Sequence, residues 1–149
     1  HSKLCQAADD FDKAVKKKAK AHPVACRLMT IPGVGPVNAL SFIALVDNPD
    51  RFSRVTDVGA FLGLTPKRHQ SGEVDWSGRV SKSGDGTMRG LLFEAASCLI
   101  RQVKRWAVGL AGRRGFRKAA VATARKIAVL MLTIWKSGTD YQWTKEATA

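Results

Sequence analysis

The sequence has few cysteines, few acidic residues and no long apolar run, and each shortage excludes a class of protein. The three cysteines, Cys5, Cys26 and Cys98, form no CxxC pair, which excludes a disulfide framework and a zinc ribbon and favours a reducing compartment. The longest apolar stretches, residues 39–46 and 127–135, are too short to span a bilayer, which takes about 20 residues. The GxxxxGK[ST] phosphate-binding loop is absent as well.

The shortage of acidic residues leaves a strongly basic chain. Lys and Arg number 25 and Asp and Glu 12, so the formal net charge is +13 over 149 residues. The excess concentrates in residues 67–126, which hold fourteen basic and four acidic residues. Such a distribution indicates a polyanionic partner, with nucleic acid ahead of an anionic membrane surface. The hydrophobic content of 45% is ordinary for a globular protein, and the length suits one domain with a real core.

Apolar periodicity predicts a mainly α-helical fold. A first helix over residues 3–21 has acidic residues early and lysines late, the order that suits the helix dipole. Its apolar stripe is thin, so it is either the end of a coiled-coil arm over residues 1–22 or a solvated helix that packs locally. Because the chain begins within this helix, we expect a fragment of a longer protein, with one domain over residues 23–149. Further helices are predicted over residues 24–30, 37–46, 54–62, 86–107 and 117–136, with Asp85 as an N-cap and Gly138 as a C-terminal stop.

Residues 63–86 differ in composition from the rest of the chain. Their five glycines and few apolar residues predict a loop-rich platform with a small irregular β-hairpin, whose strands lie near Thr65–His69 and Val74–Arg79. The cationic residues in and beside this platform are candidate contacts to a nucleic-acid backbone, with a solvated surface charge as the alternative for each. They are Lys67, Arg68, His69, Arg79, Lys82 and Arg89.

Ser71 lies among these cations. A serine hydroxyl needs a base or a metal to take its proton, and cationic neighbours would stabilise the oxygens of a phosphodiester under attack. His69 is a candidate base, but the spacing alone makes Ser71-Gly72 more typical of a turn than of a catalytic site. Competing features are the hydroxyls of Ser77, Ser81 and Ser83 and a phosphate site over residues 81–86 at a helix start. His69, Glu73 and Asp75 match no standard ligand spacing, so no metal site is predicted.

The segment Ile31-Pro32-Gly33-Val34-Gly35-Pro36 joins two predicted helices. Val34 can tuck between the helices while Gly33 and Gly35 take tight backbone angles, which leaves the first N–H groups of the second helix pointing outward. These donors suit a phosphate oxygen. The pattern looks like a helix-hairpin-helix element that binds nucleic-acid backbone. The alternative is that the glycines only close a helical corner, and the hairpin itself contains no Lys or Arg.

Several spaced blocks of the chain resemble one known family. The blocks are Pro66-x-x-x-x-Ser71-Gly72-Glu73, Gly78-Arg79-Val80-Ser81-Lys82-x-Gly84-Asp85, Arg89-x-x-Leu92-x-x-Ala95-Ala96, Ala124-Arg125-Lys126-Ile127-Ala128 and Trp135-x-x-Gly138-Thr139. Together with the hairpin they are similar to the C-terminal transposase domain of Piv-type DEDD recombinases, over about residues 22–143. This family comprises insertion-sequence transposases and DNA invertases, some guided by a bridge RNA. Met88 stands where many members have Leu, which is a conservative difference.

The resemblance implies a composite active site. Members have an N-terminal RuvC-like domain whose four carboxylates bind magnesium, a coiled-coil arm, and a C-terminal domain whose serine forms a covalent phosphoserine link to DNA. Ser71 matches that serine by position. The carboxylate domain has no counterpart in this sequence, so Mg²⁺ is expected only in the full-length protein and no cofactor within this fragment. The fragment is therefore expected to bind nucleic acid without cutting it.

The expected partners follow from the same comparison. They are DNA, a guide RNA in some members, the protein's own RuvC-like domain and further copies in a homo-oligomer. No membrane partner is expected. The expected location is the bacterial cytoplasm, in association with the nucleoid. Two alternatives to the transposase interpretation stay open. One is a non-catalytic helix-hairpin-helix module that binds nucleic acid, and the weaker one is an oligomerisation module whose charge is incidental.

Overall fold

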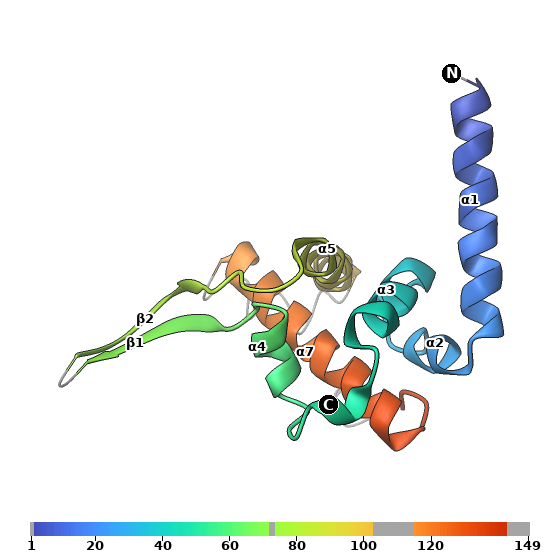
Figure 1. The fold of residues 1–149 in the computed structure, drawn as a ribbon. Coiled ribbons are helices and arrows are strands. Elements are labelled where there is room, and N and C mark those ends of the chain that lie inside the picture. The colour runs from blue at the N-terminus through green and yellow to red at the C-terminus, as the bar shows by residue number, and fades with distance from the viewer. Residues whose placement is uncertain (1, 72–73, 103–114, 143–149) are drawn as a thin grey trace.

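The computed structural model describes residues 2–71, 74–102 and 115–142, which form a helical body, a projecting helix and a β-hairpin (Figure 1). The elements are α1 (Ser2–Ala21), α2 (Pro23–Leu28), α3 (Pro36–Val46), the 3₁₀ turn η1 (Pro49–Arg51), α4 (Asp57–Phe61), β1 (Pro66–Ser71), β2 (Val74–Val80), α5 (Gly86–Gln102) and α7 (Phe116–Ser137). The expectation of a mainly α-helical chain with one small antiparallel hairpin is confirmed.

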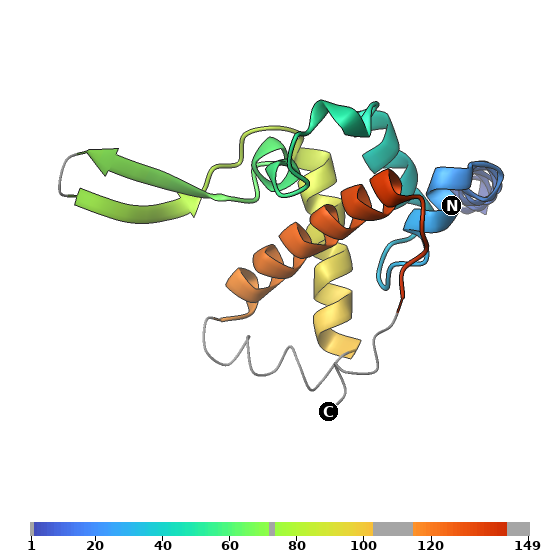
Figure 2. The ribbon, with the colours of Figure 1, turned by 90° about the horizontal axis from the view of Figure 1, so that it is seen from below.

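The crossing of α5 and α7 forms the centre of the body (Figure 2). The buried face of α7 includes Ala120, Ala124, Ala128 and Met131, which repeat at helical spacing as the sequence predicts. The alanines let the two helices approach closely, while larger side chains fill the surrounding space. Fully buried members of this core are Leu28, Phe42, Val46, Val58, Leu62, Met88, Leu92, Met131 and Leu132.

Local signals set most helix ends. The carboxylate of Asp85 accepts the Met88 N–H at 2.6 Å, so the predicted cap of α5 is confirmed. Gly138 adopts φ 68° and its N–H bonds to the Ile134 carbonyl, which ends α7 as predicted. Pro23 does more than interrupt the first helix, because it is the first residue of α2, where its missing N–H costs nothing.

Three predicted elements have the wrong bounds, and one of them is the helix expected over residues 24–30, which ends at Leu28. The helix expected over residues 54–62 is only Asp57–Phe61, since residues 54–56 form a turn and Thr56 makes no side-chain cap bond. The first strand begins and ends later than expected, at Pro66–Ser71, so Ser71 belongs to a strand rather than to a loop. The chain end folds back as far as Tyr141, whose N–H donates to Thr30 Oγ1 at 2.8 Å.

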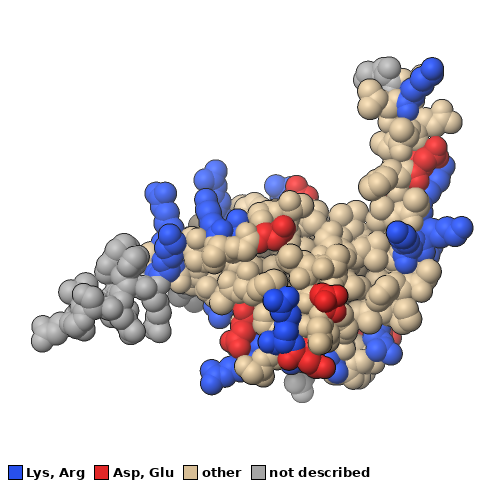
Figure 3. Space-filling model, viewed as in Figure 1, with Lys and Arg blue, Asp and Glu red and all other residues tan. Residues whose placement is uncertain are grey.

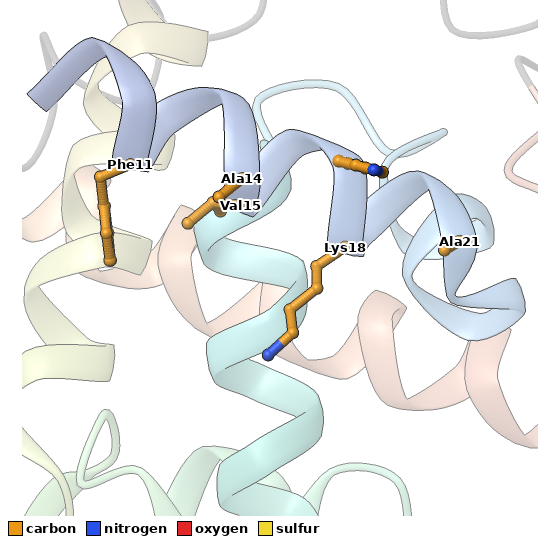
Figure 4. A pocket seen from close by; sticks show the side chains of 6 residues that line it. Phe11, Ala14, Val15, Lys18 and Ala21 are labelled. Carbon is orange, nitrogen blue, oxygen red and sulfur yellow. The ribbon is translucent and has the colours of Figure 1, made fainter. Parts of the chain in front are cut away.

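Helix α1 projects from the body, with the N-terminus far from it (Figure 1). Of its residues only Ala19 is buried, whereas the side chains of Leu4 and Phe11 are 78% and 69% exposed. A hollow of about 500 Å³ lies along its last turns, lined by Phe11, Ala14, Val15, Lys17, Lys18 and Ala21 (Figure 4). None of the helices in the described ranges is long and apolar enough to cross a membrane.

Candidate nucleic-acid interface

The β-hairpin extends away from the helical body (Figures 1 and 2). Its strands pair antiparallel, from Pro66 opposite Val80 at the root to Ser71 opposite Val74 at the outer end, with an irregularity just after Pro66. A strand rises about 3.4 Å per residue, so β1 carries the Ser71 backbone about 20 Å outward. The predicted nucleophile therefore stands at the end of an arm and not within the core.

Three of the predicted site residues are placed by their backbone alone. The side chains of residues 68–77, which include Arg68, His69 and Ser71, lie outside the described part of the chain. In the ladder His69 is opposite Trp76, and Ser71 is two positions further along the same strand. Among the residues that are described, no group of His, Cys, Asp and Glu is arranged to hold a metal ion.

The root of the hairpin is built from two chain segments in close backbone contact. The Ser81 N–H donates to the Thr65 carbonyl at 2.9 Å, and the Lys82 N–H donates to the Gly63 carbonyl at 3.2 Å. Gly63 has φ +68°, and a Cβ on it would lie 2.0 Å from the Ser83 carbonyl oxygen. Gly84 has φ +93°, and its Cβ would lie 2.2 Å from the Phe61 carbonyl oxygen. Both positions therefore exclude every side chain, a constraint that the glycine content of the platform suggests but does not locate.

Exposed cations surround this root. The side chains of Lys67, Arg79 and Lys82 are all exposed, and none makes an ion pair with a described carboxylate. Figure 3 shows Lys and Arg side chains standing out beside the hairpin. Lys82 has φ 54°, an uncommon conformation for a residue with a side chain. These cations can meet a polyanion without first breaking an ion pair within the described fold.

Arg89 is placed differently from the other predicted cationic contacts. It is half-buried in the first turns of α5, and its Nη1 lies 3.3 Å from the Leu62 carbonyl oxygen and 3.1 Å from those of Ser83 and Gly84. At least one of its nitrogens is thus directed at the protein backbone. From the sequence, Arg89 is a candidate contact to a nucleic-acid backbone or a solvated surface charge; its contact with Leu62 could not be predicted from a local pattern, because the two residues are 27 positions apart.

The start of α5 is a poor anion site. The Asp85 carboxylate already accepts the Met88 N–H, so a negative charge occupies the position that a phosphate would take. The hydroxyls of Ser81 and Ser83 lie 3.1 Å apart and hydrogen-bond to each other. The sequence alternative of a phosphate site over residues 81–86 is therefore not favoured by the structure.

The turn between α2 and α3 matches the prediction at Val34 and Gly33 but not at Gly35, whose φ of −95° is ordinary extended backbone that any residue can adopt. Val34 is buried at 6% exposure, Gly33 takes φ +85°, and Gly35 is the N-cap of α3 without a side-chain bond. Pro36 follows as the first helical residue and lacks an N–H, so the amides of Val37 and Asn38 are the first-turn donors. The geometry is compatible with backbone binding of phosphate.

The two turn glycines are expected to respond differently to alanine. A Cβ on Gly33 would lie 2.9 Å from Leu99 Cδ1 and would require a left-handed backbone, whereas a Cβ on Gly35 meets nothing within 4 Å. We expect Gly33→Ala to destabilise the chain by about 2 kcal/mol and Gly35→Ala by less than about 0.5 kcal/mol. Urea unfolding of both variants measures this difference, and equal losses would contradict the packing of Gly33 against α5.

The structure does not bring the two candidate sites together. The turn with Gly33 packs against Leu99, in the second half of α5, whereas the hairpin root is bonded to Arg89 in the first half. At 1.5 Å per residue, about 15 Å of helix separates these two positions.

Comparison with known proteins gives a consistent family. Residues 25–109 match the family described as Transposase IS116/IS110/IS902 family. The chain is 37% identical over 133 residues to a transposase for insertion sequence element IS1111A from Coxiella burnetii, covering 85% of this chain and 36% of that protein. It is 32% identical over 140 residues to a putative transposase y4pF/y4sB of Sinorhizobium fredii, covering 89% of this chain and 36% of the relative.

A third relative matches over a similar share of both chains. A probable family 20 transposase of Pseudomonas aeruginosa is 32% identical over 123 residues, which is 78% of this chain and 36% of that protein. The chain thus spans about a third of the length of the relatives it matches. The family match covers more than half of the chain and includes the α2–α3 turn, the hairpin and α5. The chain therefore belongs to the IS116/IS110/IS902 family of transposases.

Proposed function

We propose that this chain is the DNA-binding, serine-bearing part of a transposase or site-specific recombinase. The observation that carries the proposal is the hairpin, which holds Ser71 at its outer end and exposed cations at its root. A nucleic-acid backbone held by the cations at the root would have to continue about 20 Å along the arm to bring a phosphodiester to Ser71. Three relatives described as transposases support the transposase part of this assignment, and this chain covers about a third of each of them.

The proposed step is a transesterification. The Oγ of Ser71 bonds to phosphorus, and the bond from that phosphorus to the neighbouring sugar oxygen breaks. The serine proton goes to a base, and the leaving oxygen takes a proton to become a free hydroxyl. The phosphoserine ester conserves the energy of the broken bond, so the strand can be rejoined without a nucleotide cofactor.

The cationic side chains have a defined part in this step. Lys67, Arg79 and Lys82 would hold the phosphate backbone, and Arg68 and His69 adjoin Ser71 in the same strand. Magnesium does not fit the described residues, which contain no group of possible ligands arranged around one point. Its ligands, the RuvC-like domain, any guide RNA and the other protomers belong to our proposal for the full-length protein.

A second function is favoured by a separate observation. The uncapped first turn of α3 lies behind a tight glycine turn, as in modules that bind nucleic-acid backbone without chemistry. In this alternative the chain binds DNA or RNA and Ser71 is only a hairpin residue.

Covalent trapping distinguishes the transposase function from the binding-only function. The full-length protein, incubated with the DNA ends of its own element and then denatured, should retain labelled DNA on the Ser71 peptide. Strand exchange with no such ester, or with the ester on another residue, would contradict the proposed step.

Binding by the chain itself should weaken steeply with salt. Contacts from Lys67, Arg68, Arg79 and Lys82 to four phosphates correspond to a slope of about −3.6 in a plot of log affinity against log salt. Affinity for a 30-base-pair duplex should then fall about 150-fold between 50 and 200 mM salt. A gel-shift series measures the slope, and salt-independent binding would support the oligomerisation alternative.

One substitution tests a single contact within that series. Lys82→Asn removes the charge but keeps a residue that tolerates the left-handed backbone, so strain does not confound the result. We expect the slope to become shallower by about 0.9. Lys13→Asn on α1 is the control, since Lys13 already lies 3.9 Å from Asp10 and far along the chain from the hairpin. An unchanged slope for Lys82→Asn would remove Lys82 from the interface.

A further inference from the structure

Arg89 connects the two legs of the hairpin. Leu62 lies in the segment that leads into β1, whereas Ser83 and Gly84 lie in the segment that leaves β2. The Nη1 of Arg89 is within hydrogen-bond distance of the carbonyl oxygens of all three. One side chain therefore holds both legs at once, and it does so from a helix outside the hairpin.

The joint that Arg89 completes is tightly constrained. The Ser81 and Lys82 amides bond to the opposite leg, and the glycines at 63 and 84 pack backbone against backbone. The helix that carries Arg89, α5, is anchored to the core, because its residues Met88 and Leu92 are fully buried. Asp85 caps the helix at the point where the outgoing leg enters it. The hairpin thus joins the body through a network in which Arg89 is the contact from α5 to both legs.

We propose that Arg89 is a positioning residue that sets the direction of the hairpin and thereby the location of Ser71. The proposal rests on the function assigned to Ser71 above. The length of the arm explains why direction matters: a rotation of about 10° at the root moves the end of an arm of about 20 Å by about 3.5 Å. A misplacement of about 1 Å in a reacting group can cost 10²-fold in rate. Small losses of rigidity at the joint are therefore amplified at the serine.

The competing role for Arg89 is a direct phosphate contact, and three substitutions distinguish the two. Arg89→Lys keeps the charge but is about one bond too short to reach all three carbonyls. Arg89→Gln removes both the charge and the fork of donors. Arg79→Gln is the matched control, because Arg79 is an exposed arginine on β2 near the same root.

Hydrogen exchange of the whole chain reads the joint directly. In the native chain the amides of Ser81 and Lys82 should be protected nearly as well as those in the middle of α5. Arg89→Lys and Arg89→Gln should each raise exchange at these two amides at least tenfold, with the centre of α7 within threefold of the native rate. Arg79→Gln should leave both amides unchanged. Unprotected Ser81 and Lys82 amides in the native chain would overturn the proposal even if a variant failed to fold.

Measurements of DNA binding and of strand exchange complete the test. Arg89→Lys should leave the salt slope for a 30-base-pair duplex unchanged and, in the full-length protein, lower the strand-exchange rate at saturating DNA at least tenfold. A phosphate contact predicts the opposite pattern. The salt slope of Arg89→Gln would be shallower by about 0.9, Arg89→Lys would exchange strands at the native rate, and hydrogen exchange at the Ser81 and Lys82 amides would be unchanged in both variants. If Ser71 has no chemical role, Ser71→Ala keeps the native rate of strand exchange, while the hydrogen-exchange result at the Ser81 and Lys82 amides still stands. The failure of the proposed function and the failure of the positioning role of Arg89 are therefore distinguishable.

Discussion

Replacing Ser71 with alanine in the full-length protein should abolish strand exchange, with a loss of about 10⁴-fold or more, while affinity for DNA changes no more than a few-fold. The hydroxyl is the group that becomes bonded to phosphorus, and no neighbouring atom of alanine can replace it. The cations that hold the backbone are untouched by the substitution. Because Ser71 lies at the outer end of the hairpin and not in the core, the variant should also keep its fold.

The measurement compares exchange rate and affinity on the same DNA. Ser81→Ala is the control, since Ser81 is a serine of the same region whose hydroxyl bonds to Ser83 at the root. We expect this control to exchange strands at close to the native rate. Normal exchange by Ser71→Ala would remove the enzymatic interpretation and leave the nucleic-acid-binding module, whose salt dependence would be unaffected.

Replacing Phe42 with alanine should destabilise the chain by about 3–5 kcal/mol, the largest effect on stability that we expect. Phe42 is fully buried on α3, and its ring packs against that of Trp135 on α7 with centroids 6.3 Å apart. Truncation removes apolar contact and leaves a cavity where α3 packs against α7. Since ring pairs of this kind add to the burial term, the loss should lie toward the upper part of that range.

Urea unfolding followed by circular dichroism measures this loss. The control is Val37→Ala, on the same helix but with a side chain that is 44% exposed, which should change the free energy of unfolding by less than about 0.5 kcal/mol. A similar midpoint for Phe42→Ala and Val37→Ala would contradict the packing of α3 on α7. A lower slope without a lower midpoint would instead indicate a changed denatured state.

The family and the proposed chemistry rest on different observations. Membership in the IS116/IS110/IS902 transposases follows from matched residues over more than half of the chain. The proposed role of Ser71 comes from its match to the serine of the family that the sequence resembles, and the hairpin geometry supports the proposal by placing Ser71 and the cations on one arm. Because the chain spans about a third of its relatives, the remaining parts of a composite site would lie in the other two-thirds of such proteins. In our proposal this chain supplies the nucleic-acid-binding part and the serine of that site.

The sequence by itself determined the helical class, the excess of positive charge and most helix ends. The helical class and the helix ends depend on residues within a few positions of one another. The local signals are apolar side chains that repeat every 3.6 residues, a carboxylate three residues before the amide that it caps, and a glycine after the last helical turn. Asp85 and Gly138 are such cases, and their geometry matches the prediction. The buried face of α7 could also be predicted from the sequence, because its apolar residues repeat at regular helical spacing.

Only the tertiary structure decided how these pieces meet. It placed Gly33 against Leu99 and Arg89 against Leu62, and so separated the helical turn from the hairpin root by about 15 Å along α5. It also turned the nitrogen of Arg89 toward backbone carbonyls, where charge alone had suggested a phosphate. Contacts between residues tens of positions apart depend on how helices cross, and helix crossing is set by the packing of the whole core rather than by any local pattern.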